Sequence, residues 1–377
     1  MKRVSKYKVD FFLLFLIIVF AGISIATIYS SQTLLNEDMS TLYMKQITWY
    51  SVGLVLAIFI VIIKNDYIYK NAWILYIIGV ISLILLLIFG EPINNAKCWF
   101  VIPHIGSFQP SEFMKIILII TLGSMIHDFN ENHPNPSVGN EFVFLLKVLL
   151  VVAIPSILTF LQPDTGVVLI YLLITIFMLF ASGIRIRWFV LAISLLGGVI
   201  ASVLIVYFND SELFIKIFGT DFFLRVDRLL DWSSQSGYQL ENGMSAIGAG
   251  GLLGSGFLKT PIYFPEPQTD FIFAVFANNF GFIGSSILLF LITVFDIRLI
   301  HIAIKTRNSI SKYVVSGILG MLLYQQLQNI GMTIGLFPIT GITLPFISYG
   351  GSSLLSYMIM AGILLNISNE TYRYTNG

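Results

Sequence analysis

The sequence predicts an all-α integral membrane protein with about ten transmembrane helices and a large extracellular loop between helices seven and eight. Of its 377 residues, 56% are hydrophobic and only 11% are charged, whereas a soluble domain carries about 25% charged residues. A chain with so little charge cannot cover its surface with groups that water solvates, so lipid is its main solvent. The length accommodates roughly ten apolar helices of about 20 residues each, together with their connections.

Each predicted span is a nearly continuous apolar run bounded by polar residues, glycine or proline. The first run is longer than the apolar region of a signal peptide, so we expect it to be retained as a helix. A short turn at 162–165 separates the fifth span from the sixth. The spans are expected near 11–30, 47–63, 73–90, 111–126, 143–161, 166–183, 188–207, 271–295, 313–336 and 352–368.

Lysine and arginine in the connections predict the orientation of the chain. Basic residues favour the cytoplasmic side of a membrane, and here they gather at the N-terminus and in alternate connections. We therefore expect both termini to be cytoplasmic, the connection 208–270 to lie outside, and residues 1–377 to form a single membrane domain. The basic residues on the expected cytoplasmic side include Lys2, Arg3, Lys6, Lys8, Lys64, Lys70, Arg185, Arg187, Arg298, Lys305, Arg307 and Lys312.

Composition also argues against a nucleic-acid partner, an internal disulfide and a metal site built from histidines. The net charge of +1, without a basic domain, argues against nucleic acid as a partner. A single cysteine, Cys98, excludes an internal disulfide. The four histidines, His104, His127, His133 and His301, show no recurring ligand spacing, so we predict no metal site built from them.

Four carboxylates and a lysine stand where lipid or the membrane surface is expected, and such residues are costly and commonly mark a site. Glu112 and Lys115 enter the fourth span three residues apart, so they can pair on one helix face or snorkel at the interface. Asp164 either contributes to a site or makes turn and capping interactions beside proline and glycine. Asp270 precedes the eighth span, where a carboxylate can cap the first turn, but capping does not explain the nearby Glu266.

Amides and an uncharged loop add to these polar positions. Gln325 and Asn329 share one face of the ninth span, and we expect Asn278 and Asn279 to make contacts inside the bundle. The segment 337–353 has two prolines and three glycines but no charge. Irregular backbone at membrane depth is tolerated only inside protein or along a cavity. This segment should therefore fold inward, either into a site or as a packed re-entrant connector.

The outer connection begins with an amphipathic stretch and continues with a glycine-rich segment, 237–257. Its glycines indicate unusual backbone angles or close approach, and long ordered loops are uncommon without a function. Most of the polar positions lie at this face. They predict one cavity that opens outward, lined by Lys115, Asp164, Asp270 and the amides of the ninth span. A substrate with a lipid tail and a polar, anionic head would suit it.

Five segments resemble, in the correct order, motifs of the SEDS family, the RodA, FtsW and SpoVE group. They are SFQPSEFMK, LQPDTG, GYQ with AIGAGGLLGSGF, FPEPQTDFIFAV and NIGMTIGLFPITGITLPFISYGGSS. The likeness covers nearly the whole chain. It implies a bacterial cell-membrane glycosyltransferase that polymerises the glycan strands of peptidoglycan. The implied substrate is lipid II, an undecaprenyl-pyrophosphate-linked disaccharide peptide, and the implied partner is a class B penicillin-binding protein, which crosslinks the strands.

The resemblance also implies roles for particular residues. The aspartate of the TDF motif is essential in the family and corresponds to Asp270, which can act as base for the acceptor hydroxyl, with Glu266 assisting or orienting. Lys115, Arg225 or Arg228 can neutralise the leaving diphosphate, and a divalent cation is an alternative or supplement to them. The other residues expected to bind substrate are Gln109, Glu112, Asp164, Gln325, Asn329, Ser348, Tyr349, Gly350 and Gly351.

The chain departs from the family pattern at three pairs of residues. The first departure removes negative charge near the expected active face, which bears on metal use or partner contact. The short terminal segments and the motif GMTIGLFPITGI are more similar to RodA. A role in elongation and rod-shape maintenance is therefore favoured over a role in division. The departures are Asn278-Asn279 for an acidic pair, Cys98-Trp99 for Arg-Trp, and Glu241-Asn242 for Gln-Ser.

Two other functions are considered beside the polymerase: a lipid II flippase and a non-enzymatic scaffold for the penicillin-binding protein. A flippase needs polar groups through the full membrane depth. In the predicted spans the charged residues gather on the outer side and the cytoplasmic halves are almost purely apolar, which favours the polymerase. We also expect weak activity from the protein alone and a partner that opens the outer cavity. The long outer loop and the absence of an extramembrane catalytic domain motivate this expectation.

Overall fold

Helices make up nearly all of the regular structure. The computed structural model describes residues 7–35, 41–91, 97–102, 106–220, 222–223, 226 and 237–375. Strands β1 (Phe100–Ile102) and β2 (Gly106–Phe108) pair as an antiparallel hairpin, with Val101 opposite Ser107. The helices are α1 (Phe11–Ser31), the 3-10 helix η1 (Gln32–Leu34), α2 (Leu42–Ile63), α3 (Asn65–Lys70), α4 (Ala72–Phe89), α5 (Pro110–Asn132), α6 (Val138–Leu161), α7 (Thr165–Ala181), α8 (Ile186–Asn209), α9 (Ser211–Phe218), α11 (Tyr238–Ala249), α12 (Ile272–Lys305), α13 (Ser309–Thr333) and α14 (Gly351–Thr375).

Each predicted span coincides with one long helix of the described chain. By length and composition, seven of these helices can cross a membrane. Helix α7 has only 17 residues, and α5 and α13 are less apolar because they carry the polar side chains noted above. The fold class is thus confirmed, while the number of crossings stays a prediction. The coinciding helices are α1, α2, α4, α5, α6, α7, α8, α12, α13 and α14.

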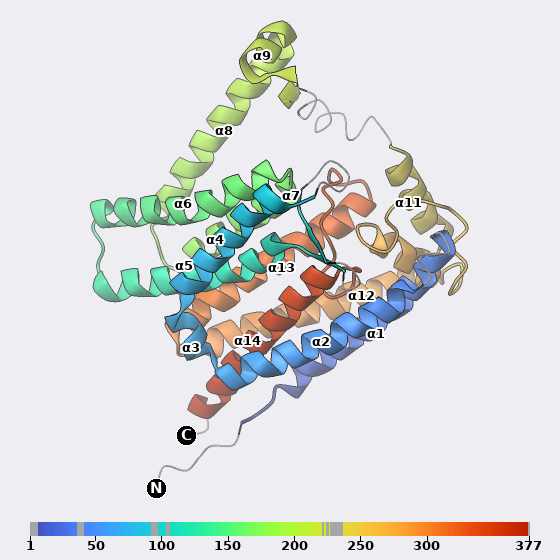
Figure 1. Cartoon of the computed structure of the whole chain (residues 1–377), viewed down its shortest axis with the longest axis horizontal. Helices are drawn as coiled ribbons and strands as arrows, with labels where there is room; N and C mark the ends of the chain where they lie inside the picture. The colour runs from blue at the N-terminus through green and yellow to red at the C-terminus, as the bar shows by residue number, and fades with distance from the viewer. Residues whose placement is uncertain are drawn as a thin grey trace.

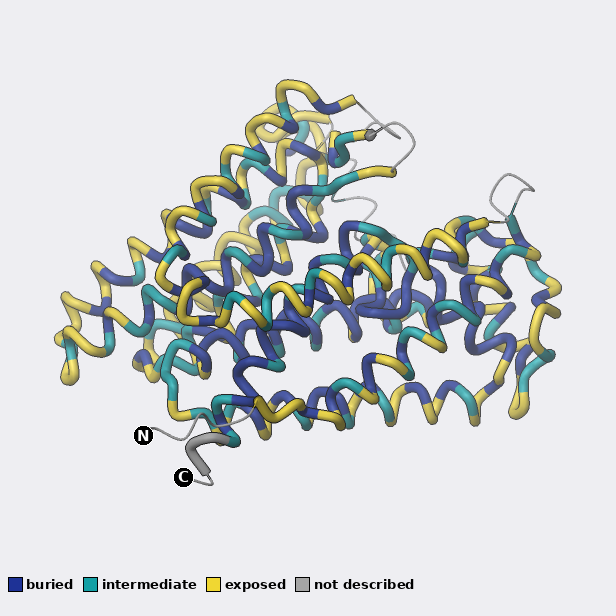
Figure 2. The backbone as a smooth tube through the Cα atoms, turned by 60° about the horizontal axis from the view of Figure 1, so that its bottom comes forward, coloured by how far each residue is buried: buried dark blue, intermediate teal, exposed yellow. Residues whose placement is uncertain are grey.

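Helices α13 and α14 form the centre of the bundle. Helix α13 packs against α5, α7 and α12, and α14 packs against α2 and α5. The apolar window of α14 is 78% buried, compared with 22% for that of α2, so α14 is a core helix and α2 a peripheral one. Figure 2 shows the same distribution, with buried backbone in the middle of the bundle and exposed backbone along its outer helices.

Helix α8 stands apart from the bundle. None of its residues is buried, and Figure 1 shows α8 projecting from the bundle with α9 at its tip. The ring of Phe214 in α9 is fully buried against Tyr207 of α8 and Phe223, at centroid distances of 5.5 and 5.9 Å. A long helix that is apolar on every side yet unburied is compatible with contact to lipid.

Among its described residues, the outer connection contains the helices α9 and α11. Its glycine-rich part lies directly against a break in α12, where Gly281 has φ +65 and ψ −163. A side chain at Gly281 would collide with the backbone of Gly254 and Leu252, and one at Gly254 would collide with Asn279. The close approach predicted from the glycines is therefore confirmed, but the predicted continuous helix at 271–295 is interrupted.

The break in α12 leaves amide groups that the glycine-rich segment satisfies. The N–H groups of Phe282 and Ile283 donate to the carbonyls of Gly251 and Leu252 at 2.9 and 3.1 Å. A helix break at membrane depth needs such partners, because hydrocarbon offers none.

The amides of Asn278 and Asn279 hold the same region together. The side-chain nitrogen of Asn278 donates to the carbonyl of Ala246 at 2.7 Å, and that of Asn279 donates to the hydroxyl of Ser30 at 2.6 Å. The predicted contacts of this pair inside the bundle are confirmed.

The termini-side half of the bundle is less apolar than the sequence suggests. Helix α12 continues to Lys305 and therefore contains Asp296, which is buried and accepts a hydrogen bond from Gln326 at 3.2 Å. Two residues later, Arg298 forms an ion pair with the buried Asp10 at 2.6 Å. The expectation of an almost purely apolar half is wrong here, because these polar groups find partners on neighbouring helices.

We expect Asp10→Ala to lower the free energy of unfolding by about 3 kcal/mol, since a buried ion pair that loses one member leaves the other uncompensated. Asp10 also caps α1 through the N–H of Leu13 and accepts a hydrogen bond from Ser368. The measurement is denaturant unfolding of the full chain in mild detergent.

Asp210→Ala is the matched control, because Asp210 caps α9 at an exposed position. Its loss should cost only about 1 kcal/mol. Equal losses for the two variants would show that the ion pair with Arg298 adds nothing beyond the cap.

Candidate active site

Four stretches of the chain meet at the end of the bundle opposite the termini. They are the start of α5, the α6–α7 turn, the segment 264–271 before α12, and the segment 337–353 between α13 and α14. Hydrogen bonds between these stretches connect most of the residues singled out in the sequence.

Glu112 and Lys115 form an ion pair in the first two turns of α5, with 2.7 Å between Nζ and Oε2. The side chain of Lys115 is 0% exposed, so the snorkelling alternative is wrong. Its ammonium also lies 5.5 Å from the ring centroid of Tyr357. The hydroxyl of Tyr357 in turn accepts a hydrogen bond from Gln325 at 2.8 Å. The expected open cavity therefore cannot be lined by Lys115 in this conformation, because the lysine lies beneath the surface.

Asp164 caps α7 and also joins the neighbouring elements. One carboxylate oxygen accepts from the N–H of Val167 at 3.1 Å, which confirms the capping interpretation, and the other accepts from the amide of Gln109 at 2.9 Å. Burial raises the pKa of Asp164 to about 6. The backbone N–H of Gln109 donates to the hydroxyl of Ser352 at 2.9 Å, so the α6–α7 turn is tied to both α5 and α14.

Glu266 organises the turn before α12. It adopts the left-handed conformation, with φ +52. Its exposed carboxylate accepts hydrogen bonds from the hydroxyl of Thr269 at 2.8 Å and the amide of Gln268 at 3.1 Å. Its carbonyl accepts from the N–H of Phe271 at 3.2 Å. These contacts fix the peptide path that leads to Asp270.

Asp270 has a different character from the other carboxylates. Helix α12 starts at Ile272 without a side-chain cap, so the capping alternative for Asp270 is wrong. Within the described ranges, its half-buried carboxylate makes no hydrogen bond or ion pair. Burial, and to a smaller extent the charge of Glu266, raises the pKa of Asp270 to about 7. It can therefore exchange a proton near neutral pH, as a general base must.

The segment 337–353 folds inward, as predicted, and packs around the backbone of Asp270. The amide of Asn329 in α13 donates to the carbonyls of Asp270 and Ile342 at 2.9 and 2.8 Å. Gly341 has φ +70, and a side-chain carbon there would lie 3.5 Å from the Oδ2 atom of Asp270. The site thus needs glycine at position 341 for the backbone conformation, whereas a side-chain carbon there would make only an ordinary contact with the carboxylate.

Ser348 and Tyr349 join the two irregular segments directly. The hydroxyl of Ser348 donates to the carbonyl of Thr269 at 2.7 Å and accepts from the N–H of Leu344 at 2.8 Å. The N–H of Tyr349 donates to the carbonyl of Gln268 at 2.9 Å. These residues position the turn through its backbone and leave the carboxylate of Asp270 unused.

The two glycines that follow have packing roles at the start of α14. A side chain at Gly351 would lie 2.7 Å from the ring of Trp49, and one at Gly350 would lie 2.5 Å from the hydroxyl of Ser353. Glycine at these positions lets α14 begin directly under the segment 337–353.

Sequence reasoning missed Tyr357, Ser352 and Gln268, which carry contacts described above. A tyrosine or serine within an apolar run resembles an ordinary core residue, so no sequence signal separates them. Arg225 and Arg228 lie outside the described residues. Among the residues that are described, no three His, Cys, Asp or Glu side chains group as a metal site. A divalent cation beside Asp270 and Glu266 would therefore need ligands from substrate or solvent.

Buried polar atoms without a protein partner also gather in these segments. Within the described chain they include the side-chain oxygens of Gln268, Gln325, Asn329 and Thr340. They provide hydrogen-bonding capacity for a polar ligand or water next to the turn.

Comparison with known proteins gives a consistent assignment. Residues 7–373 match the FtsW, RodA and SpoVE family, described as cell cycle proteins. The stage V sporulation protein E of Bacillus subtilis strain 168 is 32% identical, over 97% of this chain and 98% of its own. The probable peptidoglycan glycosyltransferase FtsW of Buchnera aphidicola is 34% identical, over 80% of this chain and 77% of its own.

Solved structures resemble this chain over almost its full length. A chain from a study of how a peptidoglycan synthase complex coordinates polymerization and crosslinking has a TM-score of 0.78 and 25% identity, covering 97% of this chain and 99% of that one. The rod shape determining protein RodA of Thermus thermophilus has a TM-score of 0.70 and 26% identity, covering 99% of both chains. The chain is therefore a multi-pass membrane protein that belongs to the SEDS family of FtsW, RodA and SpoVE proteins.

Proposed function

We propose that this protein is a peptidoglycan glycosyltransferase that polymerises glycan strands from lipid II at the outer face of the bacterial cell membrane. The observation that carries the proposal is Asp270, a half-buried carboxylate with a pKa of about 7 and no structural partner in the described chain. The surrounding turn is fixed through its backbone, so the carboxylate is held in place while remaining available for chemistry.

In the proposed reaction, Asp270 takes the proton of the acceptor sugar hydroxyl as that oxygen attacks the anomeric carbon of the donor. A new glycosidic bond forms, and the bond between the anomeric carbon and the lipid diphosphate breaks with its electron pair. Glu266 orients the turn through Thr269 and Gln268. Its nearby charge also raises the pKa of Asp270. Gln325, Asn329, Ser348 and Tyr349 keep the two irregular segments together.

Lys115 is proposed to neutralise the leaving diphosphate, but only after a rearrangement, because its side chain is enclosed beside Glu112 and Tyr357. This supports the expectation that the protein alone is weakly active and that a partner opens the site. The proposed partner is a class B penicillin-binding protein. A solved relative that comes from a peptidoglycan synthase complex supports this choice.

A lipid II flippase remains the second candidate, because buried polar groups such as Asp296 also occur toward the termini side. The polymerase is favoured because Asp296 is engaged by Gln326, whereas the carboxylate of Asp270 has no such partner in the described chain. The termini are proposed to be cytoplasmic, from the basic residues on their side.

Within the family we propose a RodA-like role in elongation, because the motif GMTIGLFPITGI is more similar to RodA. The FtsW and SpoVE names of the relatives above support a division or sporulation role as the alternative. Complementation of elongation-deficient and division-deficient cells separates these roles.

We expect Asp270→Asn to reduce lipid II polymerisation by about 100-fold or more, the usual contribution of a general base. The measurement is a gel assay of glycan strands made by the purified protein together with its partner. Asp296→Asn is the matched control, because Asp296 is a buried carboxylate in the termini-side half of α12, remote from the candidate site. This variant should polymerise at close to the wild-type rate.

Equal polymer from wild type and a folded Asp270→Asn variant would remove Asp270 from the mechanism. If the wild type makes no polymer but moves labelled lipid II across proteoliposomes, the protein is a flippase. The assay without the partner should give much less polymer. An undiminished rate would contradict activation by the partner.

The pH profile offers a separate test of Asp270 as the base. The reaction needs the deprotonated carboxylate, so the rate should rise with pH and reach half its maximum near pH 7, the pKa of Asp270. Glu266→Gln removes a negative charge that raises this pKa, so its profile should shift toward lower pH. An unshifted profile in Glu266→Gln would mean that the titrating group is not Asp270.

Ser348→Ala should lower polymerisation by about 10-fold, because the turn before α12 loses its hydroxyl link to Thr269, a bond worth about 1–3 kcal/mol when a buried partner is left unpaired. Ser356→Ala is the control, since this buried serine bonds only within its own helix, to the carbonyl of Ser353. If both variants retain wild-type rates while remaining folded, the Ser348 link does not position the site.

A further inference from the structure

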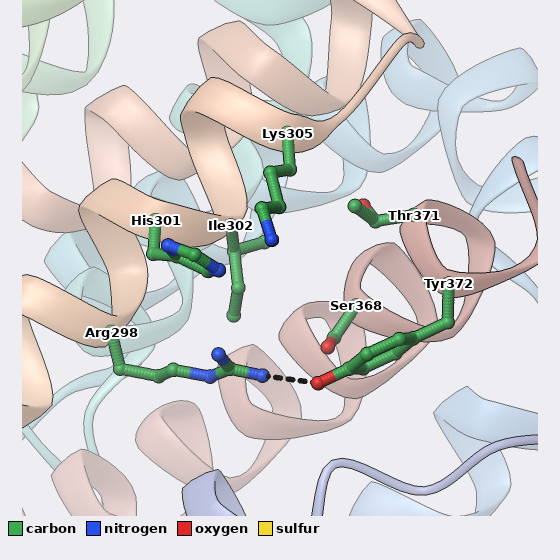
Figure 3. A pocket seen from close by; sticks show the side chains of 7 residues that line it. All are labelled: Arg298, His301, Ile302, Lys305, Ser368, Thr371 and Tyr372. Carbon is green, nitrogen blue, oxygen red and sulfur yellow. Dashed lines mark hydrogen bonds between the residues drawn. The ribbon is translucent and has the colours of Figure 1, made fainter. Parts of the chain in front are cut away.

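A cavity lies at the opposite end of α12, between the last turns of α12 and α14 (Figure 3). It is a small hollow of about 30 Å³ that opens to solvent. Helix α12 has 34 residues with one break at Gly281, which corresponds to a path of roughly 50 Å along its axis at 1.5 Å per residue. The cavity is therefore remote from the candidate active site. Its lining residues are Arg298, His301, Ile302, Lys305, Ser368, Thr371 and Tyr372.

Arg298 is already neutralised at one edge of this cavity. Its guanidinium donates to the Oδ2 atom of Asp10 at 3.0 and 2.6 Å and to the hydroxyl of Tyr372 at 2.8 Å. Ser368 donates to the same carboxylate oxygen at 2.7 Å. The carboxylate of Asp10 is thus paired with Arg298, and it forms no ion pair with His301 or Lys305 in the described chain.

His301 and Lys305 face the cavity from α12, four residues apart and on one side of the helix (Figure 3). Both are exposed, and neither forms an ion pair with any carboxylate of the described chain. Lys305 brings an amino group and His301 a ring N–H to this side. The cavity therefore presents a cation and a hydrogen-bond donor opposite the hydroxyl groups of α14.

An apolar stripe borders these basic residues. Ile297, Ile300 and Ile304 occupy the adjacent face of α12, and all three are exposed, Ile304 at 76%. Phe11, next to Asp10 at the start of α1, is also 76% exposed. A cationic hollow beside apolar side chains that face lipid matches the two parts of a phospholipid, its headgroup phosphate and its acyl chains.

The helix dipole and the orientation rule both favour basic residues at this end of α12. They account for the presence of Lys305 and His301, but not for their convergence with three hydroxyl-bearing side chains on one hollow. We propose that the cavity binds the phosphate of an anionic phospholipid from the leaflet on the side of the termini. Lys305 and His301 contact the phosphate oxygens, and the isoleucine stripe contacts the acyl chains.

Native mass spectrometry of the full-length protein in detergent tests this proposal, with phosphatidylglycerol and phosphatidylcholine as probes. Wild type should retain one phosphatidylglycerol at concentrations at which phosphatidylcholine is lost. The variant His301→Gln/Lys305→Gln should weaken this retention about 10-fold. Both positions are exposed, so the variant should fold, and its melting temperature without lipid verifies this.

The control is Lys70→Gln/Lys312→Gln, which removes two exposed basic residues from other connections on the same side and should keep wild-type retention. Equal retention of phosphatidylglycerol by the cavity variant and the control would overturn the proposal, as would equal retention of the two lipids by wild type.

A second arm of the experiment adds millimolar glycerol phosphate. Displacement of the lipid by this soluble phosphate would overturn the lipid assignment and identify a site for soluble phosphate compounds. The readout does not involve polymerisation, so it is independent of the proposed function.

Discussion

Every peptide group that leaves a helix at membrane depth needs a partner inside the protein, because hydrocarbon supplies none. In the part of the chain that the structure describes, the backbone departs from helical structure at Gly281 and through 337–353, and in each place another irregular segment provides the partner. The carbonyls of 251–252 serve the break in α12. The segment 337–353 shares hydrogen bonds with 264–271 through Tyr349 and Ser348. These backbone hydrogen bonds fix the turn before α12, and they leave the carboxylate of Asp270 without a partner in the described chain.

The ion pair of Glu112 with Lys115 obeys a related constraint. Moving two charges out of water carries a desolvation penalty that their mutual attraction often does not offset. A buried ion pair is therefore weak evidence that the pair stabilises the fold. The ammonium of Lys115 gains a further contact from the ring of Tyr357, whose hydroxyl is itself held by Gln325. The pair is therefore enclosed by contacts from α5, α13 and α14, and the role proposed above for Lys115 requires a conformation in which these contacts open.

Apolar runs were sufficient to locate the long helices, and the uncharged, proline-containing segment 337–353 was sufficient to predict that it folds inward. The extension of α12 past residue 295 could not be predicted, since Asp296 and Arg298 would normally end a span. Their partners, Gln326 and Asp10, are distant in sequence and adjacent only in the folded chain. The burial of Lys115 was missed for the same reason, because it depends on Tyr357, a residue with no distinguishing sequence pattern.

The break at Gly281 divides α12 into parts with different attachments. The part after the break is anchored by Asp296 to α13 and by Arg298 to α1 and α14. The part before it is attached to α11 through the hydrogen bond of Asn278, and the turn that leads into it is attached to α13 through the Asp270 carbonyl, which accepts from Asn329. A hinge absorbs a change of backbone direction at a few residues. The geometry therefore permits the outer part, with Asp270, to adjust to a substrate or partner while the inner part keeps the termini-side end of the bundle in place.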